Sequence, residues 1–282
     1  MTIRALIEKA ETVLRESPHP ERARLDSEAL LMHLLRRNRA WLLAHRDKEI
    51  TTADTSEYQE LIERRREGEP IQYIKGEAEF YGLPFRVTPD VLIPRPETEH
   101  LVAEAVALAF VFPKPRVLDV GTGSGAIAIA IAHEAPSCAV TATDVSDSAL
   151  EIARFNAERT GFAKQIRFLR GDLLTPVAGE QFEIIASNPP YIPIGDRDTL
   201  SIEVRDHEPH SALFAGDDGF EIYRRLIPGA FDLLVPNGWL VLEIGFGQQS
   251  AIEVLLQSAG YSQIHFIPDY QGIPRVAAAQ RS

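Results

Sequence analysis

Residues 116–132 read RVLDVGTGSGAIAIAIA, and this stretch carries the strongest signal of the fold class. Its first five residues form an apolar run typical of a buried strand, the next five are rich in glycine, and the last seven predict a helix that is apolar nearly all round. A strand, a glycine turn and a helix in this order are typical of a nucleotide-binding unit. The glycines permit a tight turn and let the backbone approach a ligand closely.

The rest of the chain from residue 94 onward alternates strands with helices. This alternation predicts an α/β fold built on a mostly parallel sheet. Besides 116–120, we expect strands at 139–143, 166–170, 182–187, 239–244, 265–267 and 276–278, and helices at 101–110, 126–132, 147–159, 222–234 and 251–258.

Two acidic residues follow the next predicted strands. Asp144 ends the run 139–143, at a position where a carboxylate can accept both ribose hydroxyls of a nucleotide. Asp172 follows the strand at 166–170 and can accept from an adenine amino group, while Leu173 can pack on the ring.

The glycine turn is compatible with two different cofactors. The pattern Gly121-x-Gly123-x-x-Ala126 also satisfies the dinucleotide fingerprint, so the turn alone does not separate NAD from S-adenosylmethionine. Asp119, directly before the glycines, suits a ligand with a cationic ammonium better than one with a pyrophosphate.

The tetrapeptide Asn188-Pro189-Pro190-Tyr191 follows the apolar run 182–187, where a central strand of an open sheet ends. Ligand sites of such sheets lie at the carboxyl ends of their strands. The two prolines fix two φ angles and remove two N–H donors, which makes this rim stiff. A side-chain amide, free carbonyl oxygens and an aromatic face then suit a planar group that donates two hydrogens, such as an exocyclic amine or a carboxamide.

Composition narrows the class of protein. The chain has 282 residues, of which 45% are hydrophobic, as in a globular protein with a sizeable core. A single cysteine, Cys138, excludes an internal disulfide and fits a reducing compartment. The acidic start of the chain is no signal peptide, and no apolar run reaches transmembrane length, so we predict a cytoplasmic protein.

Charge is unevenly spread along the chain. Residues 1–70 carry 13 Lys and Arg against 14 Asp and Glu, whereas the remainder carries 16 against 27. An acidic catalytic part is a poor partner for naked nucleic acid. The arginines at 36–39 and 64–66 are candidates for docking an acidic partner, or are solvated helix faces.

The first 93 residues differ in pattern from the rest. Apolar stripes predict helices near 6–14, 24–37, 41–43 and 52–67, and the short β-prone runs 71–74 and 85–87 predict a hairpin. We therefore expect a helical bundle at 1–69 that docks the substrate, a β-hairpin linker at 70–93 and a catalytic domain at 94–282.

Three stretches carry a family resemblance: GEPIQYIKG at 68–76, IPRPETE at 93–99 and VRDHEP at 204–209. With the glycine turn and Asn-Pro-Pro-Tyr, they resemble the HemK/PrmC family over essentially the whole chain. This family methylates the side-chain amide nitrogen of the glutamine in the Gly-Gly-Gln motif of class I peptide chain release factors. The resemblance implies a Rossmann-like, seven-stranded class I methyltransferase fold with a small helical N-terminal domain.

The resemblance also implies roles for single residues. Asn188 Oδ1 and the Pro189 carbonyl would accept the two amide hydrogens, and Tyr191 would pack against the substrate amide. S-adenosylmethionine would be the cofactor, and the chain would act without a metal, as a monomer away from membranes. The cofactor-binding residues would be Gly121, Thr122, Gly123, Ser124, Gly125, Asp144, Asp172, Leu173 and Asn188, and the substrate-binding ones Asn188, Pro189, Pro190 and Tyr191.

Alternative substrates stay open at this point. A related activity modifies a glutamine of a ribosomal protein, and the Asn-Pro-Pro-Tyr rim is shared with enzymes that methylate amino groups of nucleic acids. A nucleotide binder of the dehydrogenase type is the alternative from another class of protein.

Overall fold

The computed structural model describes residues 1–282, and the chain divides into two compact units. The first unit comprises Met1–Glu77 together with Leu200–His207, and the second comprises Ala78–Thr199 together with Glu208–Ser282. The helical unit thus combines the N-terminal residues with a segment from far along the sequence, which the contiguous division at 69 and 93 does not anticipate.

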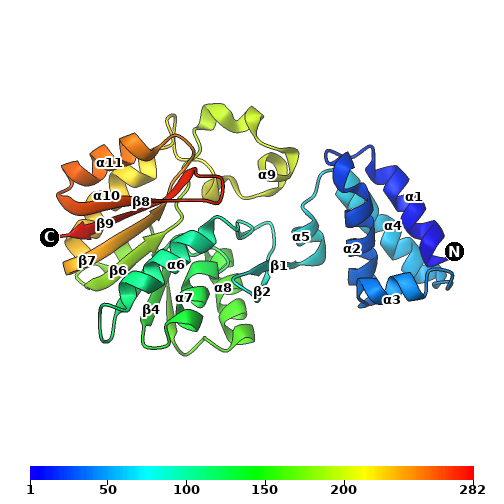
Figure 1. Cartoon of the computed structure of the whole chain (residues 1–282), viewed down its shortest axis with the longest axis horizontal. Coiled ribbons are helices and arrows are strands. Elements are labelled where there is room, and N and C mark those ends of the chain that lie inside the picture. Colours follow the sequence, from blue (N-terminus) through cyan, green and yellow to red (C-terminus); the bar gives the residue numbers. More distant parts are fainter. The chain divides into compact units, whose positions relative to one another are not determined.

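The first unit is helical (Figure 1), and the apolar stripes predicted its helices before residue 69. Thr2, Asn38 and Thr51 each cap a helix by accepting a backbone N–H with the side chain, which fixes three helix starts. Its elements are α1 (Ile3–Leu14), the 3₁₀ turn Pro20–Arg22, α2 (Ala23–Leu35), α3 (Arg39–Ala44), α4 (Thr52–Arg66), α5 (Ile71–Lys75) and α9 (Ile202–His207).

A buried ion cluster joins the second segment to the helical unit. Arg65 Nε donates to Asp26 Oδ2 over 2.7 Å, and both side chains are almost fully buried. The same guanidinium pairs with Glu203 of α9. Gly68 has a positive φ, and a Cβ there would lie 2.6 Å from Ile202 Cγ2, so glycine is required for this close approach. Because Arg65 contacts both carboxylates, it links α4 to α2 and to α9 within this unit.

The prediction of a strand at 71–74 was wrong, because these residues form α5. Pro70 accepts the first backbone hydrogen bonds of the helix, and Gly76 ends it with a left-handed φ of 69°. The five-residue spacing between this proline and glycine leaves room for one helical turn, which buries Tyr73 and Ile74.

The hairpin lies within the predicted range 70–93, but its first strand follows 71–74 and its second strand overlaps the predicted run 85–87. It consists of β1 (Glu77–Phe80) and β2 (Leu83–Arg86), which form a two-stranded sheet. Tyr81 and Gly82 connect them with φ values of 53° and 71°. Two positive φ angles in a two-residue loop are typical of the turns that match strand twist.

The second unit is an α/β domain built on a seven-stranded sheet, as the alternating pattern predicted. Its strands are β3 (Arg116–Val120), β4 (Ala139–Asp144), β5 (Ile166–Arg170), β6 (Phe182–Ser187), β7 (Leu234–Glu243), β8 (Tyr261–Pro268) and β9 (Pro274–Arg281). Its helices are α6 (Thr98–Ala109), α7 (Ala126–Glu134), α8 (Asp147–Thr160), α10 (Glu221–Leu233) and α11 (Gln249–Ser258), with 3₁₀ turns at Thr175–Val177, Ile194–Thr199 and His210–Ala212.

The strand order β5-β4-β3-β6-β7-β9-β8 contains one topological switch point. The chain runs outward from β3 to β4 and β5, then returns to place β6 on the other side of β3. Four strand pairs are parallel, and β9 pairs antiparallel with both β7 and β8. The carboxyl ends of β3 and β6 therefore meet at the position where open sheets bind their ligands.

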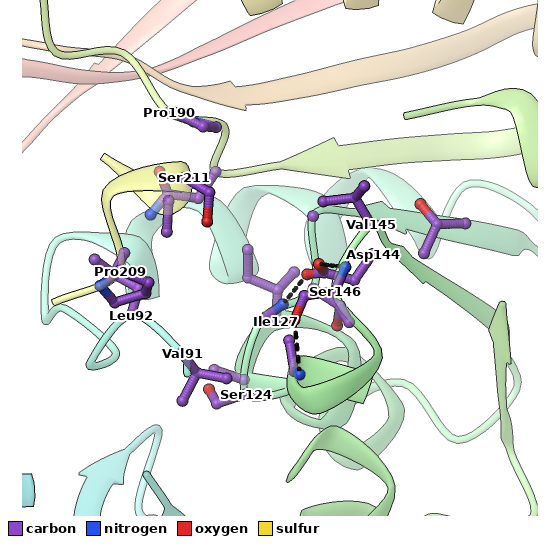
Figure 2. A pocket seen from close by; sticks show the side chains of 18 of the residues that line it. Val91, Leu92, Ser124, Ile127, Asp144, Val145, Ser146, Pro190, Pro209 and Ser211 are labelled. Atoms are coloured by element: carbon purple, nitrogen blue, oxygen red, sulfur yellow. Dashed lines mark hydrogen bonds between the residues drawn. The ribbon is translucent and has the colours of Figure 1, made fainter. Parts of the chain in front are cut away.

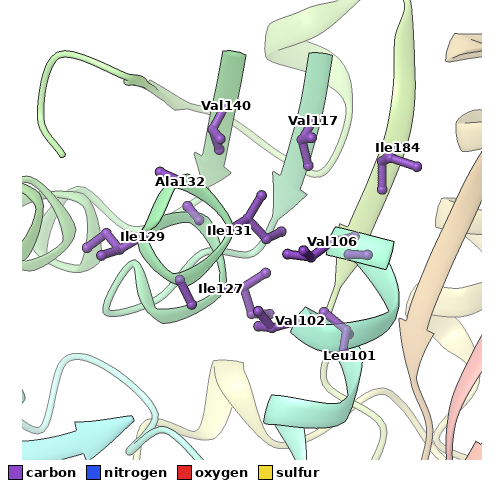
Figure 3. Close-up of a cluster of buried hydrophobic side chains, with 14 of the residues drawn as sticks. Leu101, Val102, Val106, Val117, Ile127, Ile129, Ile131, Ala132, Val140 and Ile184 are labelled. Atoms are coloured by element: carbon purple, nitrogen blue, oxygen red, sulfur yellow. The ribbon is translucent and has the colours of Figure 1, made fainter. Parts of the chain in front are cut away.

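Apolar residues cover both faces of the sheet. Successive residues of β3 alternate between faces, so Val117 belongs to one buried cluster and Leu118 to the other. Figure 3 shows the first cluster, in which Val102 and Val106 of α6 and Ile131 of α7 gather beside the strands. Helices α10 and α11 supply the cluster on the opposite face (Figure 1). Burial on both faces keeps the two switch-point strands rigid at their carboxyl ends.

Candidate active site

One pocket of the α/β unit lies at the switch point. Val120 and Ser187 are partners in the β3–β6 ladder, so Gly121 and Asn188, which follow them, start from adjacent positions. The pocket brings together the predicted residues Gly121, Thr122, Gly123, Ser124, Asp144, Asp172, Leu173, Asn188 and Pro190. It does not include Gly125, Pro189 or Tyr191 in its lining. Figure 2 shows Asp144 and Ser146 on one side of the pocket, with Pro190, Pro209 and Ser211 across from them.

The glycine turn leaves room for a ligand. Gly121 and Gly123 both have positive φ angles, and a Cβ built on either would meet no atom within 4 Å. Gly125 serves another purpose, because a Cβ there would lie 3.1 Å from Ala153 Cβ of α8. Two glycines therefore open the backbone to the pocket, and the third lets helix α8 pack closely.

Asp144 faces the same turn from the end of β4. Its Oδ2 accepts the Gly123 N–H and its Oδ1 accepts the Ser146 N–H, each over 2.9 Å (Figure 2). A carboxylate has about four acceptor positions, so both oxygens retain capacity for hydroxyl donors from a ligand. The same carboxylate thus supports the turn and faces the pocket.

Asp119 is fully buried behind the turn and does not line the pocket. Its Oδ2 accepts hydrogen bonds from the Thr122 hydroxyl over 2.6 Å and from the Ala128 N–H over 3.2 Å. Its Oδ1 has no hydrogen-bond partner. Burial raises the pKa of Asp119 to about 7. Asp119 was predicted to suit a ligand with a cationic group. In the structure its contacts instead hold the glycine turn in place.

Asp172 and Leu173 also line the pocket. The Asp172 carboxylate is exposed and pairs with Arg225 of α10. Leu173 has a positive φ of 49°, and its carbonyl accepts Thr143 Oγ1 over 3.2 Å. This unusual backbone, held by a strand residue, fixes where Leu173 lies against the pocket.

The Asn-Pro-Pro-Tyr rim is held by a network that the sequence did not predict. Asn188 Nδ2 donates to Thr98 Oγ1 over 3.2 Å, and Thr98 Oγ1 donates to Glu243 Oε2 over 2.5 Å. No hydrogen bond from the chain reaches Asn188 Oδ1 or the Pro189 carbonyl oxygen. Tyr191 is packed against the cluster on the α10–α11 face, with its hydroxyl 3.4 Å from Glu243 Oε1. The substrate contact predicted for Tyr191 stays a prediction.

Sequence reasoning missed Thr98 and Glu243 as site residues. Thr98 lies inside the IPRPETE stretch, which contributed to the family resemblance but gave no role to Thr98. Glu243 is an acid in the otherwise apolar run at 239–244, and a charge inside a buried strand was the available signal.

A second missed contact joins two of the three family stretches, through Arg95 of IPRPETE and Glu208 of VRDHEP. Arg95 Nη2 lies 2.7 Å from both carboxylate oxygens of Glu208, whose side chain is 1% exposed. Arg95 lines the pocket together with Pro209, the residue after Glu208. This ion pair therefore ties the loop before α6, which lines the pocket, to the segment after α9.

Glu243 makes stability depend on pH. Burial raises its pKa from a usual value of 4.5 to about 7. Between those two values the folded chain holds a proton that the unfolded chain releases, so the free energy of unfolding falls as the pH rises through this window. The slope is at most about 1.4 kcal/mol per pH unit for one group.

Glu243→Gln is neutral at every pH and should lack this contribution. Urea unfolding of both proteins at pH 5, 6, 7 and 8 should show the wild type losing stability relative to the variant up to about pH 7. The difference should then level off. Parallel curves for the two proteins would contradict the raised pKa.

The fold and the site together define a class of protein. A seven-stranded sheet of this order, with an antiparallel last pair, a glycine turn at its switch point and an acid on the neighbouring strand, is a Rossmann-like class I methyltransferase. None of its helices has the length and apolar character needed to cross a bilayer.

Comparison with known proteins identifies the family. Residues 5–76 match the PrmC N-terminal domain, and residues 99–203 match the methyltransferase small domain. A release factor glutamine methyltransferase of Koribacter versatilis is 42% identical over 282 residues, which is 100% of this chain and 99% of that relative. One of Moorella thermoacetica is 42% identical over 262 residues, covering 93% and 92% of the two chains. The chain belongs to the release factor glutamine methyltransferase family.

A solved structure supports the fold. The crystal structure of a methyltransferase from Pyrococcus furiosus matches with a TM-score of 0.52 and 24% identity, over 71% of this chain and 90% of that one. The enzyme uses S-adenosylmethionine, as methyltransferases of this family do. The open glycine positions and the Asp144 carboxylate fit this cofactor.

Proposed function

We propose that this enzyme methylates the side-chain amide nitrogen of the glutamine in the Gly-Gly-Gln motif of class I peptide chain release factors. The observation that carries the proposal is the pair of unused acceptors at the switch point, Asn188 Oδ1 and the Pro189 carbonyl. Two acceptors on a stiff rim suit a planar group with two N–H donors. Full-length similarity to release factor glutamine methyltransferases narrows that group to a glutamine carboxamide.

The rim addresses the chemical difficulty of the reaction. An amide nitrogen is a poor nucleophile because its lone pair is delocalised into the carbonyl. Accepting both N–H hydrogens draws electron density toward the nitrogen and fixes its position. S-adenosylmethionine supplies an electrophilic methyl group on a positively charged sulfur. Alignment and preorganised acceptors are therefore what the protein must provide, and together they lower such barriers by several kcal/mol.

The cofactor would lie along the glycine turn. In this proposal Gly121, Gly123 and their neighbours Thr122 and Ser124 line its amino-acid part, Asp144 accepts its ribose hydroxyls, and Asp172 and Leu173 contact the adenine. The common lining of one pocket by these residues supports the assignment.

We also propose a role for each part of the chain in acting on a release factor. Residues 1–69 would dock the release factor, the hairpin within 70–93 would link the parts, and 94–282 would carry out the reaction. We further propose that the enzyme acts as a monomer in the cytoplasm and does not bind nucleic acid directly. The excess of Asp and Glu beyond residue 70 supports the last point.

A labelling experiment tests the substrate. The purified protein is incubated with S-adenosylmethionine labelled in its methyl group and with a class I release factor, either unchanged or with Gln→Ala in the Gly-Gly-Gln motif. Label should appear on the unchanged factor alone. A ribosomal protein fraction and a nucleic acid fraction serve as competing substrates. Equal labelling of the two release factors, or faster labelling of a competing fraction, would refute the proposal.

A further inference from the structure

Three polar side chains from distant parts of the sequence form a line behind the rim. Asn188 follows β6, Thr98 begins α6 and Glu243 ends β7. Their contacts are 3.2 Å from Asn188 Nδ2 to Thr98 Oγ1 and 2.5 Å from Thr98 Oγ1 to Glu243 Oε2. Thr98 and Glu243 are 4% and 2% exposed, so water does not compete for these bonds.

The direction of the Asn188 amide follows from counting hydrogens. A threonine hydroxyl has one hydrogen to donate, and an ionised carboxylate can only accept. When Glu243 is ionised, the Thr98 hydrogen is therefore committed to Glu243, and Thr98 can only accept from Asn188. Asn188 must then turn its NH₂ toward Thr98, which leaves Oδ1 free for a ligand.

We propose that Thr98 and Glu243 are positioning residues that fix the Asn188 side chain with its acceptor oxygen toward the substrate amide. The proposal rests on the proposed function, because it explains how the rim presents an acceptor. A flipped Asn188 would point two donors at a substrate group that itself donates. The Glu243 carboxylate would not touch Asn188 and would act on it only through the Thr98 hydroxyl.

The groups around Glu243 determine when it is ionised. Glu97 at the start of α6 opposes ionisation, and Arg275 of β9 favours it, as do the hydroxyls of Thr98 and Tyr191. Tyr223 of α10 donates to the Glu243 backbone carbonyl over 2.7 Å. Burial outweighs the favourable contacts and raises the pKa to about 7. A protonated Glu243 can itself donate to Thr98, which frees the threonine hydrogen for Asn188 Oδ1.

Matched variants of Thr98 test the proposal. Thr98→Val keeps the shape of the side chain and removes the hydroxyl, whereas Thr98→Ser keeps the hydroxyl and removes a methyl group. We expect Thr98→Val to lose at least tenfold more kcat than Thr98→Ser, with S-adenosylhomocysteine Kd values within twofold of each other. Thr160→Val, which removes a hydroxyl bonded to the Asn156 carbonyl in α8, controls for loss of a helix hydroxyl elsewhere.

The outcomes separate this inference from the proposed function. Wild-type enzyme that fails to label the release factor glutamine would refute the function itself. If the wild type labels it, a ratio of kcat below tenfold between Thr98→Ser and Thr98→Val overturns the positioning role. Such a result would mean that the Thr98 hydroxyl is not what the reaction requires.

The pH profile of kcat tests the part assigned to Glu243. Wild-type kcat should fall as the pH drops below about 7, and Glu243→Gln should lack this acidic limb because its amide does not titrate. Circular dichroism at each pH shows that both proteins stay folded. The same limb in both proteins would overturn the role of Glu243.

Discussion

Replacing Asn188 with alanine is expected to lower kcat for release factor methylation by about a hundredfold or more. The substitution removes the acceptor oxygen that faces the pocket and leaves the two prolines of the rim in place. It also leaves Thr98 Oγ1 without its donor, but Thr98 retains its bond to Glu243. Affinity for S-adenosylhomocysteine should fall far less than turnover, because the residue acts mainly on the substrate amide.

Asn188→Asp tests whether the reaction needs the amide donor of Asn188 as well as its acceptor oxygen. The aspartate retains an acceptor but cannot donate to Thr98, and its charge favours the cationic cofactor over a transition state in which the sulfur is being neutralised. This variant should therefore also fold and also lose most turnover. Single-turnover methylation and S-adenosylhomocysteine binding are measured side by side, with Gln257→Ala on the exposed surface of α11 as the control. Near wild-type methylation by Asn188→Ala would show that the rim does not hold the amide.

Asp144→Ala is expected to weaken S-adenosylhomocysteine binding by roughly 1.5–3 kcal/mol, the range for hydrogen bonds to a charged partner. This corresponds to a rise in Kd of about 10- to 150-fold. The substitution removes the proposed ribose acceptor and also the anchor of the Gly123 N–H. Because two backbone N–H groups lose their partner, the melting temperature should fall by a few degrees.

A cofactor analogue separates the two roles of Asp144. Calorimetry compares S-adenosylhomocysteine with its 2′-deoxy analogue, on the wild type and on Asp144→Ala. Loss of the hydroxyl should weaken binding to the wild type and have little effect on the variant. Asp147→Ala is the matched control, since its exposed carboxylate pairs with Arg170 outside the pocket. An unchanged Kd in Asp144→Ala, or an equal deoxy effect in both proteins, would mean that Asp144 only supports the turn.

The sequence predicted the elements of the catalytic domain because its signals there are local. The apolar run of β3, the glycines after it and the apolar helix α7 lie within one continuous stretch, so their order and type can be seen without a partner. The acid at the end of β4 and the prolines after β6 were placed in the same way. Local signals failed at Ile71–Lys75, where β-prone residues form a helix between Pro70 and Gly76.

Tertiary structure decided the side of the sheet to which each strand returns, and with it the composition of the site. Glu243 lies 145 residues beyond Thr98 in sequence, and Asn188 lies 90 residues beyond it, yet their side chains form one chain of hydrogen bonds. The contacts of Glu203 with Arg65 and of Glu208 with Arg95 likewise join segments more than a hundred residues apart.

The glycine turn and the ends of the central strands could be placed from the sequence alone, because φ preferences and side-chain periodicity act over a few residues. Which of those ends face each other could be seen only in the folded chain, because that depends on which buried faces pack together. The acceptor on Asn188 is therefore visible in the sequence. The threonine and glutamate that orient it become visible only when β6, α6 and β7 lie side by side.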